Sequence, residues 1–355
     1  MGEPFVSPVA RRRLADSPSP TQPSLCSPFA AVAVPELPHP NLPLPTFGGK
    51  QFWADRLHFR GWRVQQHVVT GHCRLLDPRS IRRSWGPYPR CVERLEEAKR
   101  RLALPPIEGE VVVVLHGLIR ARTSMRRLCR YLRDEGGYEV CNVSYPSTRA
   151  TMATHAANLA SIVAGLSGAR QVHFVGHSMG NIVVRRYLAD RQQAASDAAL
   201  PPIGRVVMIT PPNQGAQFAR RLARLSLLHV VLGKPFAELG RDWATLERSL
   251  VTPADCGIIA GGRGRDCGYN PLLDGDDDLV VSVEETRLAG ASDFIVLPAT
   301  HTFLMNRPDV QRQTLLFLKT GHFDHAQDAR VDSDCRAVRA ASGTSPPQTA
   351  SPDEP

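Results

Sequence analysis

The feature of this 355-residue chain that most constrains its fold is a regular alternation of short apolar runs and helical segments between residues 106 and 322. The first run, residues 111–115 (VVVVL), is too short for a helix and has the composition of a strand buried on both faces. The other expected strands are 138–144, 171–175, 205–210, 257–260 and 293–297, and the expected helices are 123–133, 152–166, 181–189 and 308–318. This alternation predicts an α/β fold with a mostly parallel central sheet flanked by helices on both faces.

The two ends of the chain have a different composition. Residues 1–45 and 323–355 are rich in proline and serine and have no periodic apolar face, so we expect a disordered leader and a disordered tail. Residues 46–105 hold three of the four tryptophans together with many arginines, and they end in an expected helix over 89–102. We expect this N-terminal extension to pack on the domain that follows, and an interaction module for a partner protein is the alternative.

The net charge of +9 comes largely from arginines. These are scattered along the chain and aromatic residues make up only 6% of it, whereas nucleic-acid-binding proteins gather basic and aromatic side chains on one surface. The charge therefore predicts no nucleic-acid partner and leaves peripheral contact with an anionic membrane surface as an alternative. No run approaches the ~20 apolar residues that span a bilayer, and no signal-peptide pattern is present, so we expect a cytoplasmic protein.

The eight cysteines form no Cys-x-x-Cys pair and no dense framework, which argues against a zinc site and a disulfide scaffold. We expect most of them to be reduced and partly buried. Cys256 and Cys267 are near enough in sequence for a bridge across a loop, which stays open as an alternative. We expect no metal and no organic cofactor.

Residues 176–180 (GHSMG) follow one expected strand and precede an expected helix. A G-x-S-x-G sequence in this context predicts a nucleophile elbow, a tight turn that exposes the hydroxyl of Ser178 at the N-terminus of the helix. Gly176 and Gly180 allow the strand and the helix to approach closely, and His177 and Met179 complete the motif. We predict that Ser178 is a catalytic nucleophile.

A serine hydroxyl needs a general base that is oriented by a carboxylate. The base is predicted to be His301, in the loop after the last strand, and a structural histidine is the alternative. The acid is predicted to be Asp278, because it directly precedes an apolar segment, with Asp276 in reserve. A solvated turn or a calcium loop is the alternative reading of this acidic cluster.

The oxyanion of such a reaction needs two backbone donors. The N–H of Met179, after the nucleophile, is one, and the N–H of Leu118, in the loop after the first strand, is the other. Gly117 allows close approach of that loop, and His116 is expected to fix it by a hydrogen bond.

Several motifs now fall in a familiar order. They are LHGL at 115–118, YPS at 145–147, the serine turn, PPNQG at 211–215, the Asp278 loop and HTF at 301–303. Over about residues 107–320 the chain resembles the lipase and esterase branch of the α/β-hydrolase superfamily, which implies the α/β-hydrolase fold for residues 106–322. It departs from the family in one place, because the family's acid is often followed by glycine and Asp278 is followed by Leu279.

The resemblance places a small cap segment over the serine at residues 215–250. Apolar side chains recur there at helical spacing, at Phe218, Leu222, Leu225 and Leu228. An amphipathic helix at this position would line an acyl pocket or touch lipid, and an ordinary helix that covers the sheet is the alternative.

These residues together predict a serine hydrolase that cleaves carboxylic esters of small molecules or lipids through an acyl-enzyme. An amidase, a thioesterase or an acyltransferase would use the same three side chains. A non-catalytic binding scaffold with this fold is a further alternative.

Overall fold

The computed structural model describes residues 44–45, 49, 51–194, 200–217, 219 and 232–327. The expected disordered leader and tail lie outside these residues, apart from Leu44–Pro45 and residues 323–327. Phe323 in the latter segment is buried against Phe317, so the end of the folded domain includes residues that were expected to belong to the tail.

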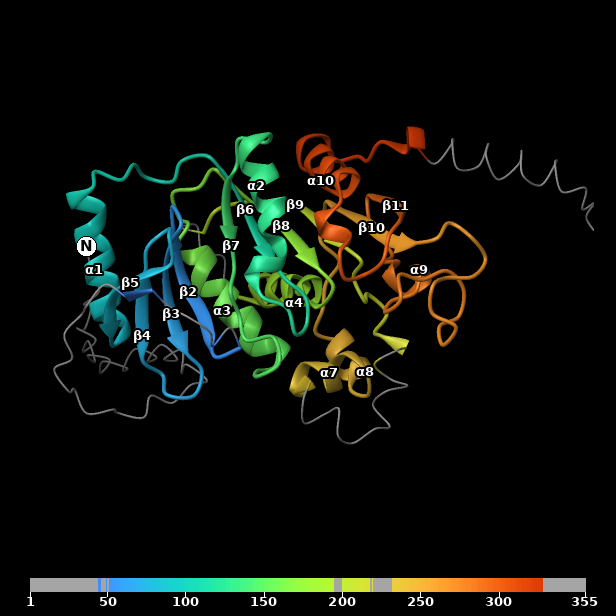
Figure 1. Ribbon diagram of the computed structural model, residues 1–355, viewed down its shortest axis with the longest axis horizontal. Coiled ribbons are helices and arrows are strands. Elements are labelled where there is room, and N and C mark those ends of the chain that lie inside the picture. The colour runs from blue at the N-terminus through green and yellow to red at the C-terminus, as the bar shows by residue number, and fades with distance from the viewer. Residues whose placement is uncertain are drawn as a thin grey trace, which may run out of the picture. The chain divides into compact units, whose positions relative to one another are not determined.

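A parallel sheet of six strands forms the centre of the fold, as predicted (Figure 1). Its strands are β6 (Glu110–Leu115), β7 (Glu139–Asn142), β8 (Gln171–His177), β9 (Ile203–Ile209), β10 (Cys256–Gly262) and β11 (Asp293–Pro298). Their order in the sheet is β11-β10-β9-β8-β6-β7. The chain moves outward from β6 to β7 and then returns to the other side of β6 with β8, so the strand order reverses between β6 and β8. In open parallel sheets, ligands bind at the C-terminal ends of the strands beside such a reversal.

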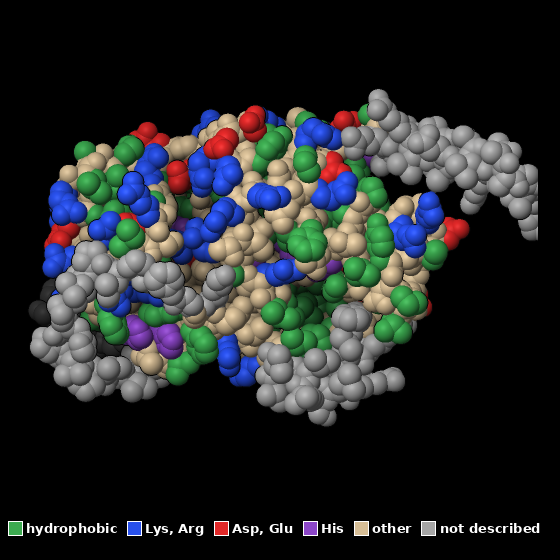
Figure 2. All heavy atoms as spheres, viewed as in Figure 1, with side chains coloured by type: hydrophobic (Ala, Val, Ile, Leu, Met, Phe, Trp, Pro, Cys, Tyr) green, Lys and Arg blue, Asp and Glu red, His purple; other side chains and the backbone are tan. Residues whose placement is uncertain are grey.

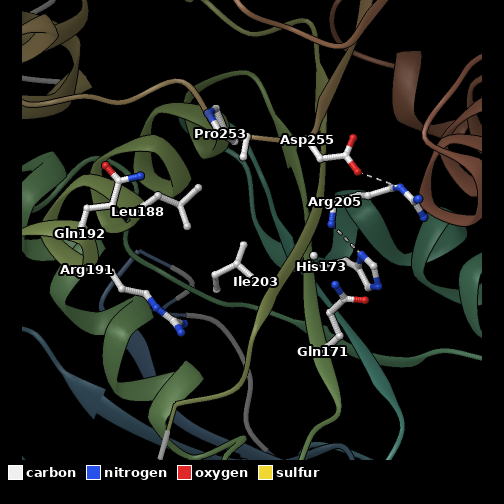
Figure 3. A pocket seen from close by; sticks show the side chains of 11 residues that line it. Gln171, His173, Leu188, Arg191, Gln192, Ile203, Arg205, Pro253 and Asp255 are labelled. Atoms are coloured by element: carbon white, nitrogen blue, oxygen red, sulfur yellow. Dashed lines mark hydrogen bonds and ion pairs between the residues drawn. The ribbon is translucent and has the colours of Figure 1, made fainter. Parts of the chain in front are cut away.

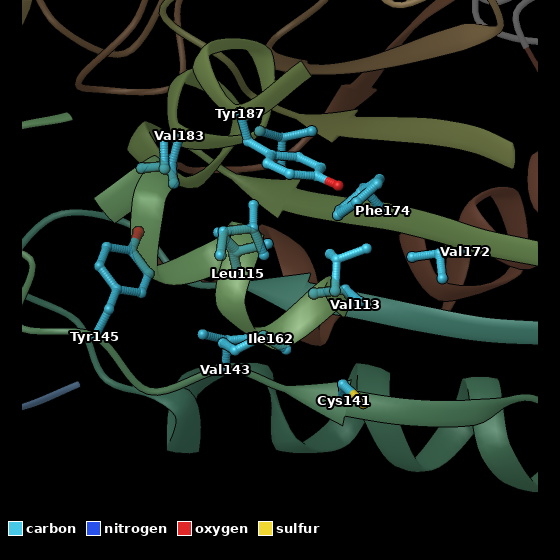
Figure 4. Close-up of a cluster of buried hydrophobic side chains, with 14 of the residues drawn as sticks. Val113, Leu115, Cys141, Val143, Tyr145, Ile162, Val172, Phe174, Val183 and Tyr187 are labelled. Carbon is cyan, nitrogen blue, oxygen red and sulfur yellow. The ribbon is translucent and has the colours of Figure 1, made fainter. Parts of the chain in front are cut away.

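Successive valines of β6 point to opposite faces of this sheet, so both faces are apolar and helices cover both of them. Val111 and Val113 pack with α3 (Met152–Ala164) and α4 (Met179–Gln193), and Figure 4 shows part of this cluster around Val113, Phe174 and Tyr187. Val112 and Val114 pack on the other face. The elements there are η1 (Arg122–Met125), α2 (Arg126–Asp134), η2 (Leu304–Asn306) and α10 (Pro308–Thr320).

Shorter elements complete the domain. They are α7 (Lys234–Leu239), α8 (Trp243–Glu247), α9 (Val283–Thr286) and η3 (His325–Gln327). None of the helices in the described ranges has the length and apolar character needed to cross a bilayer. Cys256 is buried in β10 and Cys267 is exposed, and both are free thiols, so the alternative of a loop bridge between them is wrong.

The N-terminal extension contains a second sheet that the sequence analysis did not predict. It is antiparallel, with the order β1-β5-β4-β3-β2, and the helix α1 (Tyr88–Arg101) follows it close to the expected 89–102. Its strands are β1 (Leu44–Pro45), β2 (Trp53–Phe59), β3 (Trp62–His67), β4 (Cys73–Leu76) and β5 (Ile81–Gly86). Trp62, Val64 and Leu75 belong to the same apolar cluster as Val111 and Val113 of β6, so the two sheets share one core.

Asp55 in β2 is a buried carboxylate that ties this second sheet to the central domain. It accepts hydrogen bonds from His58 Nε2 at 2.7 Å, Gln65 Nε2 at 2.6 Å and the backbone N–H of Ser144 at 2.7 Å. Its own N–H donates to the carbonyl of Ser144. Burial alone would raise the pKa of Asp55, but His58, Arg63 and the donated hydrogen bonds outweigh it and hold this pKa well below its usual value.

Asp55→Ala should therefore lower the free energy of unfolding by about 3 kcal/mol or more, because it leaves buried donors on three residues without an acceptor. Urea denaturation measures this loss. Since a depressed pKa contributes stability only above the ordinary carboxyl pKa, the gap between wild type and variant should narrow as the pH falls below about 4. Glu97→Ala is the control, because Glu97 pairs with Arg94 at an exposed position. A gap that stays constant at low pH would contradict this account of Asp55.

Candidate active site

Ser178 lies in the turn between β8 and α4 and has a strained backbone, with φ 52° and ψ −125°. Non-glycine residues rarely adopt such a conformation, and it persists only where the surroundings enforce it. Here the Ser178 N–H donates to the carbonyl of Ile209 at 2.9 Å. The side-chain amide of Asn181 donates to the carbonyls of both Ser178 and Ile209, at 3.0 and 3.2 Å. These bonds tie the turn to the end of β9.

Glycines allow the chain segments around Ser178 to touch. A Cβ atom on Gly180 would lie 2.9 Å from the carbonyl oxygens of both Leu115 and His116, so the start of α4 rests directly on the end of β6. A Cβ on Gly117 would lie 3.1 Å from the Cβ of Ser178. The loop after β6 therefore reaches the serine, as the sequence predicted. A Cβ on Gly176 would collide with the side-chain Oδ1 of Asn181.

His116 holds this loop from behind. Its Nδ1–H donates to the carbonyl of Gly117 at 2.9 Å, its ring stacks on Tyr145 at 4.3 Å between centroids, and its carbonyl accepts from the Tyr145 hydroxyl. Burial lowers the pKa of His116 to about 4, so the ring is neutral near pH 7. A neutral buried ring fits the predicted role of a support and not that of a proton carrier.

Two backbone N–H groups remain beside Ser178. Met179 is the first residue of α4, where a helix has no internal partner for its N–H groups. Leu118 follows Gly117 in the loop after β6. Within the described part of the chain, no hydrogen bond from either amide is found, so both are available to a bound oxygen atom.

His301 and Asp278 form a buried pair at the same edge of the sheet. His301 Nδ1 lies 2.7 Å from Asp278 Oδ2, and the His301 N–H donates to the Asp278 carbonyl at 2.8 Å. The other carboxylate oxygen, Oδ1, accepts from the N–H groups of Val280 and Val281. In the tautomer whose Nδ1–H donates to this carboxylate, Nε2 has a lone pair that can accept a proton.

The other aspartates of the cluster have different partners. Asp276, the reserve acid, accepts from the N–H groups of Arg263 and Gly264 at 2.7 and 2.8 Å. Asp277 accepts from those of Asn270 and Leu279. Both carboxylates shape the loop, and among the three only Asp278 contacts the histidine. In the ranges that the structure describes, no three His, Cys, Asp or Glu side chains are grouped as metal ligands.

Thr210 belongs to this site although the sequence analysis did not single it out. It follows the end of β9, is buried, and has a positive φ of 44°. Its hydroxyl donates to Asp278 Oδ2 and lies 3.2 Å from His301 Nδ1. The only sequence signal was a hydroxyl residue at the C-terminal end of a buried strand, immediately before Pro211.

His177 also has more than a motif role. Its Nε2–H donates to the carbonyl of His301 at 3.0 Å, and the two rings lie 4.9 Å apart. Burial, followed by the charge of His301, lowers the pKa of His177 far below its usual value. The neutral His177 ring therefore links the turn at Ser178 to the backbone of His301.

An apolar wall stands beside the loop after β6. Ala216, Ala219 and Phe236 form a buried cluster, with Leu118 and Leu232 packed against it. Figure 2 shows a hollow lined by hydrophobic side chains near the C-terminal ends of the central strands, with histidine atoms at its edge. The predicted amphipathic helix of the cap, including Phe218, Leu222, Leu225 and Leu228, lies outside the described residues.

A different hollow, shown in Figure 3, lies at the opposite edge of the sheet. Its lining includes Gln171 and His173 at the start of β8, Ile203 at the start of β9, and Asp255 just before β10. Ser178 follows the other end of β8, a strand of 7 residues or about 23 Å. This hollow is therefore not part of the candidate site.

A family model described as the alpha/beta hydrolase family matches residues 112–332, more than half of the chain. The protein belongs to the alpha/beta hydrolase family. No curated protein sequence matches it significantly.

Solved structures to which the chain is similar include a lipase and an esterase. A lipase of Bacillus licheniformis is 19% identical, with 61% of this chain and 91% of that chain covered and a TM-score of 0.44. The product of gene lin2722 of Listeria innocua is 17% identical, with coverages of 62% and 100% and a TM-score of 0.42. A thermophilic esterase of Thermogutta terrifontis is also 17% identical, with coverages of 61% and 92% and a TM-score of 0.39.

Thr210→Val in this alpha/beta hydrolase keeps the shape of the side chain but removes the hydroxyl that donates to Asp278. The free energy of unfolding should fall by about 1–3 kcal/mol, because a buried carboxylate oxygen loses a donor. Urea denaturation measures the change. Thr252→Val is the matched control, since the Thr252 hydroxyl bonds to the carbonyl of Ala289 at an exposed position. Equal losses in the two variants would show that the Thr210 hydroxyl contributes nothing beyond a surface contact.

Proposed function

We propose that this protein is a serine hydrolase that cleaves carboxylic esters of small molecules or lipids through an acyl-enzyme. One observation carries the proposal: the buried Asp278–His301 pair lies at the sheet edge where the strained turn presents Ser178. His177, the neighbour of Ser178, bonds to the backbone of His301 and so brings these two parts together.

In the proposed reaction, His301 Nε2 takes the proton of the Ser178 hydroxyl while Oγ attacks the ester carbonyl. The negative charge that develops on the carbonyl oxygen is stabilised by the N–H groups of Leu118 and Met179. The ester C–O bond then breaks, and His301 returns the proton to the leaving alcohol. Water repeats the sequence on the acyl-enzyme and releases the carboxylic acid.

The apolar wall favours an acyl group as the part of the substrate nearest the serine. Leu118 would contribute both an N–H to the oxyanion and a side chain to this wall, which it shares with Phe236. An acyl chain that contacts the wall would hold its carbonyl carbon near Ser178. Asp278, held by four donors, is proposed to keep His301 in the tautomer whose Nε2 accepts a proton.

The experiment is hydrolysis of p-nitrophenyl esters from acetyl to palmitoyl, by wild type and Ser178→Ala in parallel. Wild type should turn over at least one ester, and Ser178→Ala should lower kcat by about a thousandfold or more. Best activity on short chains would identify an esterase, and best activity on long chains a lipase. Equal activity in both proteins would refute the mechanism. Absence of any serine-dependent ester cleavage would refute the ester assignment and direct the search to amides, thioesters or binding.

Asp278→Asn and Asp276→Asn form a matched pair that tests the acid. Asp278→Asn should lower kcat by about a thousandfold or more, because an amide no longer favours the required His301 tautomer. Asp276→Asn should lower it by less than about tenfold, since its partners are loop amides. Kinetics on the best ester, with circular dichroism to check folding, measures both effects. The reverse order would assign the acid to Asp276.

A further inference from the structure

A shallow hollow lined by basic and polar side chains lies beside the candidate active site. It is formed where η1 and the start of α2 face η2 and the residues on either side of it. We call it the basic hollow, and the side chains that matter here are Thr123, Arg126, Arg127, Phe303, Asn306 and Arg307. Figure 2 shows Lys and Arg side chains over α2 and between it and α10.

The positive charge of the basic hollow is only partly neutralised. Arg307 pairs with Asp309 at 2.7 Å. Arg126 and Arg127 are exposed, and neither has an ion pair within the described part of the chain. An anion in the hollow would therefore meet two uncompensated guanidinium groups.

Arg126 and Arg127 do not stabilise the helix that carries them. Both lie in the first turn of α2, which contains no acidic residue. The N-terminus of a helix has a partial positive charge, so cations there are unfavourable for the helix. A negatively charged ligand at this place would be stabilised by the arginines.

The basic hollow adjoins the proposed catalytic groups. Phe303, which lines it, lies two residues after His301. Arg120, two residues after Leu118, donates from Nη2 to the carbonyl of Thr302 at 3.5 Å, so the loops that carry Leu118 and His301 are in contact.

This edge also exposes large apolar side chains. Ile119 is 59% exposed and Phe303 is 65% exposed. Ile119 has a φ of 61°, a costly conformation for a β-branched residue, and it directs an apolar side chain into solvent. Basic and apolar groups together fit a ligand that is itself amphiphilic.

We propose that the basic hollow binds a phosphate group of an amphiphilic ester whose acyl bond is cleaved at Ser178, with Ile119 and Phe303 in contact with its apolar part. The inference rests on the proposed function and names its substrate class. Guanidinium groups pair well with phosphate oxygens, and the hydroxyl of Thr123 and the amide of Asn306 can donate to the remaining ones. The phosphate belongs to a phospholipid headgroup in a bilayer or to a soluble phosphate ester, and the test separates these two sources.

The first arm measures binding without turnover. Full-chain Ser178→Ala protein is floated with vesicles of phosphatidylcholine alone or mixed with phosphatidylglycerol, at constant ionic strength. Binding should require the anionic lipid and should weaken on the order of tenfold in Arg126→Gln/Arg127→Gln. The matched control is Arg130→Gln/Arg133→Gln, which removes the same charge from exposed positions of α2 that do not line the basic hollow. Equal losses of vesicle binding in the two double variants would show that only the net charge of the protein matters, and would overturn the proposal.

The second arm uses inorganic phosphate as the probe, with binding measured by calorimetry. Phosphate binding that is lost in Arg126→Gln/Arg127→Gln, without vesicle binding, would support a soluble phosphate ester. Vesicle binding that also falls in Phe303→Ser would support the phospholipid. No binding in either arm would overturn the proposal. If phosphate or vesicle binding depends on the two arginines but wild type hydrolyses no ester, the proposed function is wrong and the basic hollow is a phosphate site only.

Discussion

The tie between the Ser178 turn and the end of β9 is the interaction on which the rest of the site depends. The Ser178 N–H and the Asn181 side chain both bond to the carbonyl of Ile209, and Thr210, the next residue, bonds to Asp278. The end of one strand thus fixes the serine turn on one side and the acid on the other. A strained backbone at Ser178 persists because several bonds enforce it at once.

A second layer of support comes from outside the central sheet. Asp55 bonds to the backbone of Ser144, and Tyr145, the next residue, bonds to the carbonyl of His116. Gln51 donates to the carbonyl of Arg120 on the far side of the same loop. The loop that carries Leu118 is therefore held at both ends by contacts that lead to the N-terminal extension.

The sequence predicted most of the central domain because its strands are buried on both faces and read as continuous apolar runs. The expected strands and helices agree with β6 to β11 and with α2, α3, α4 and α10 to within a few residues. The second sheet was missed because polar residues such as Asp55, Arg63 and Gln65 interrupt its short strands, which therefore lack the continuous apolar runs of the central sheet.

Within the site, the pairing of His301 with Asp278 agrees with the prediction from chain order and from the apolar segment after the acid. Thr210 and His177 could not be assigned from the sequence, because their roles arise from contacts across 68 and 124 residues. No local pattern records such contacts. A hydroxyl at the end of a buried strand becomes informative only when the neighbouring strands are known.

The bonds of Asp55 to Ser144 and of Arg56 to Ser161 span 89 and 105 residues of chain. During synthesis, the N-terminal sheet therefore emerges from the ribosome well before the segments that satisfy its buried polar groups and cover its apolar face. Until about residue 165 has emerged, β2 has a polar side that lacks these partners, so the sheet cannot complete its folding alone. The N-terminal sheet is synthesised first, but it can complete its folding only after the middle of the domain has been made. Until then its apolar face stays exposed.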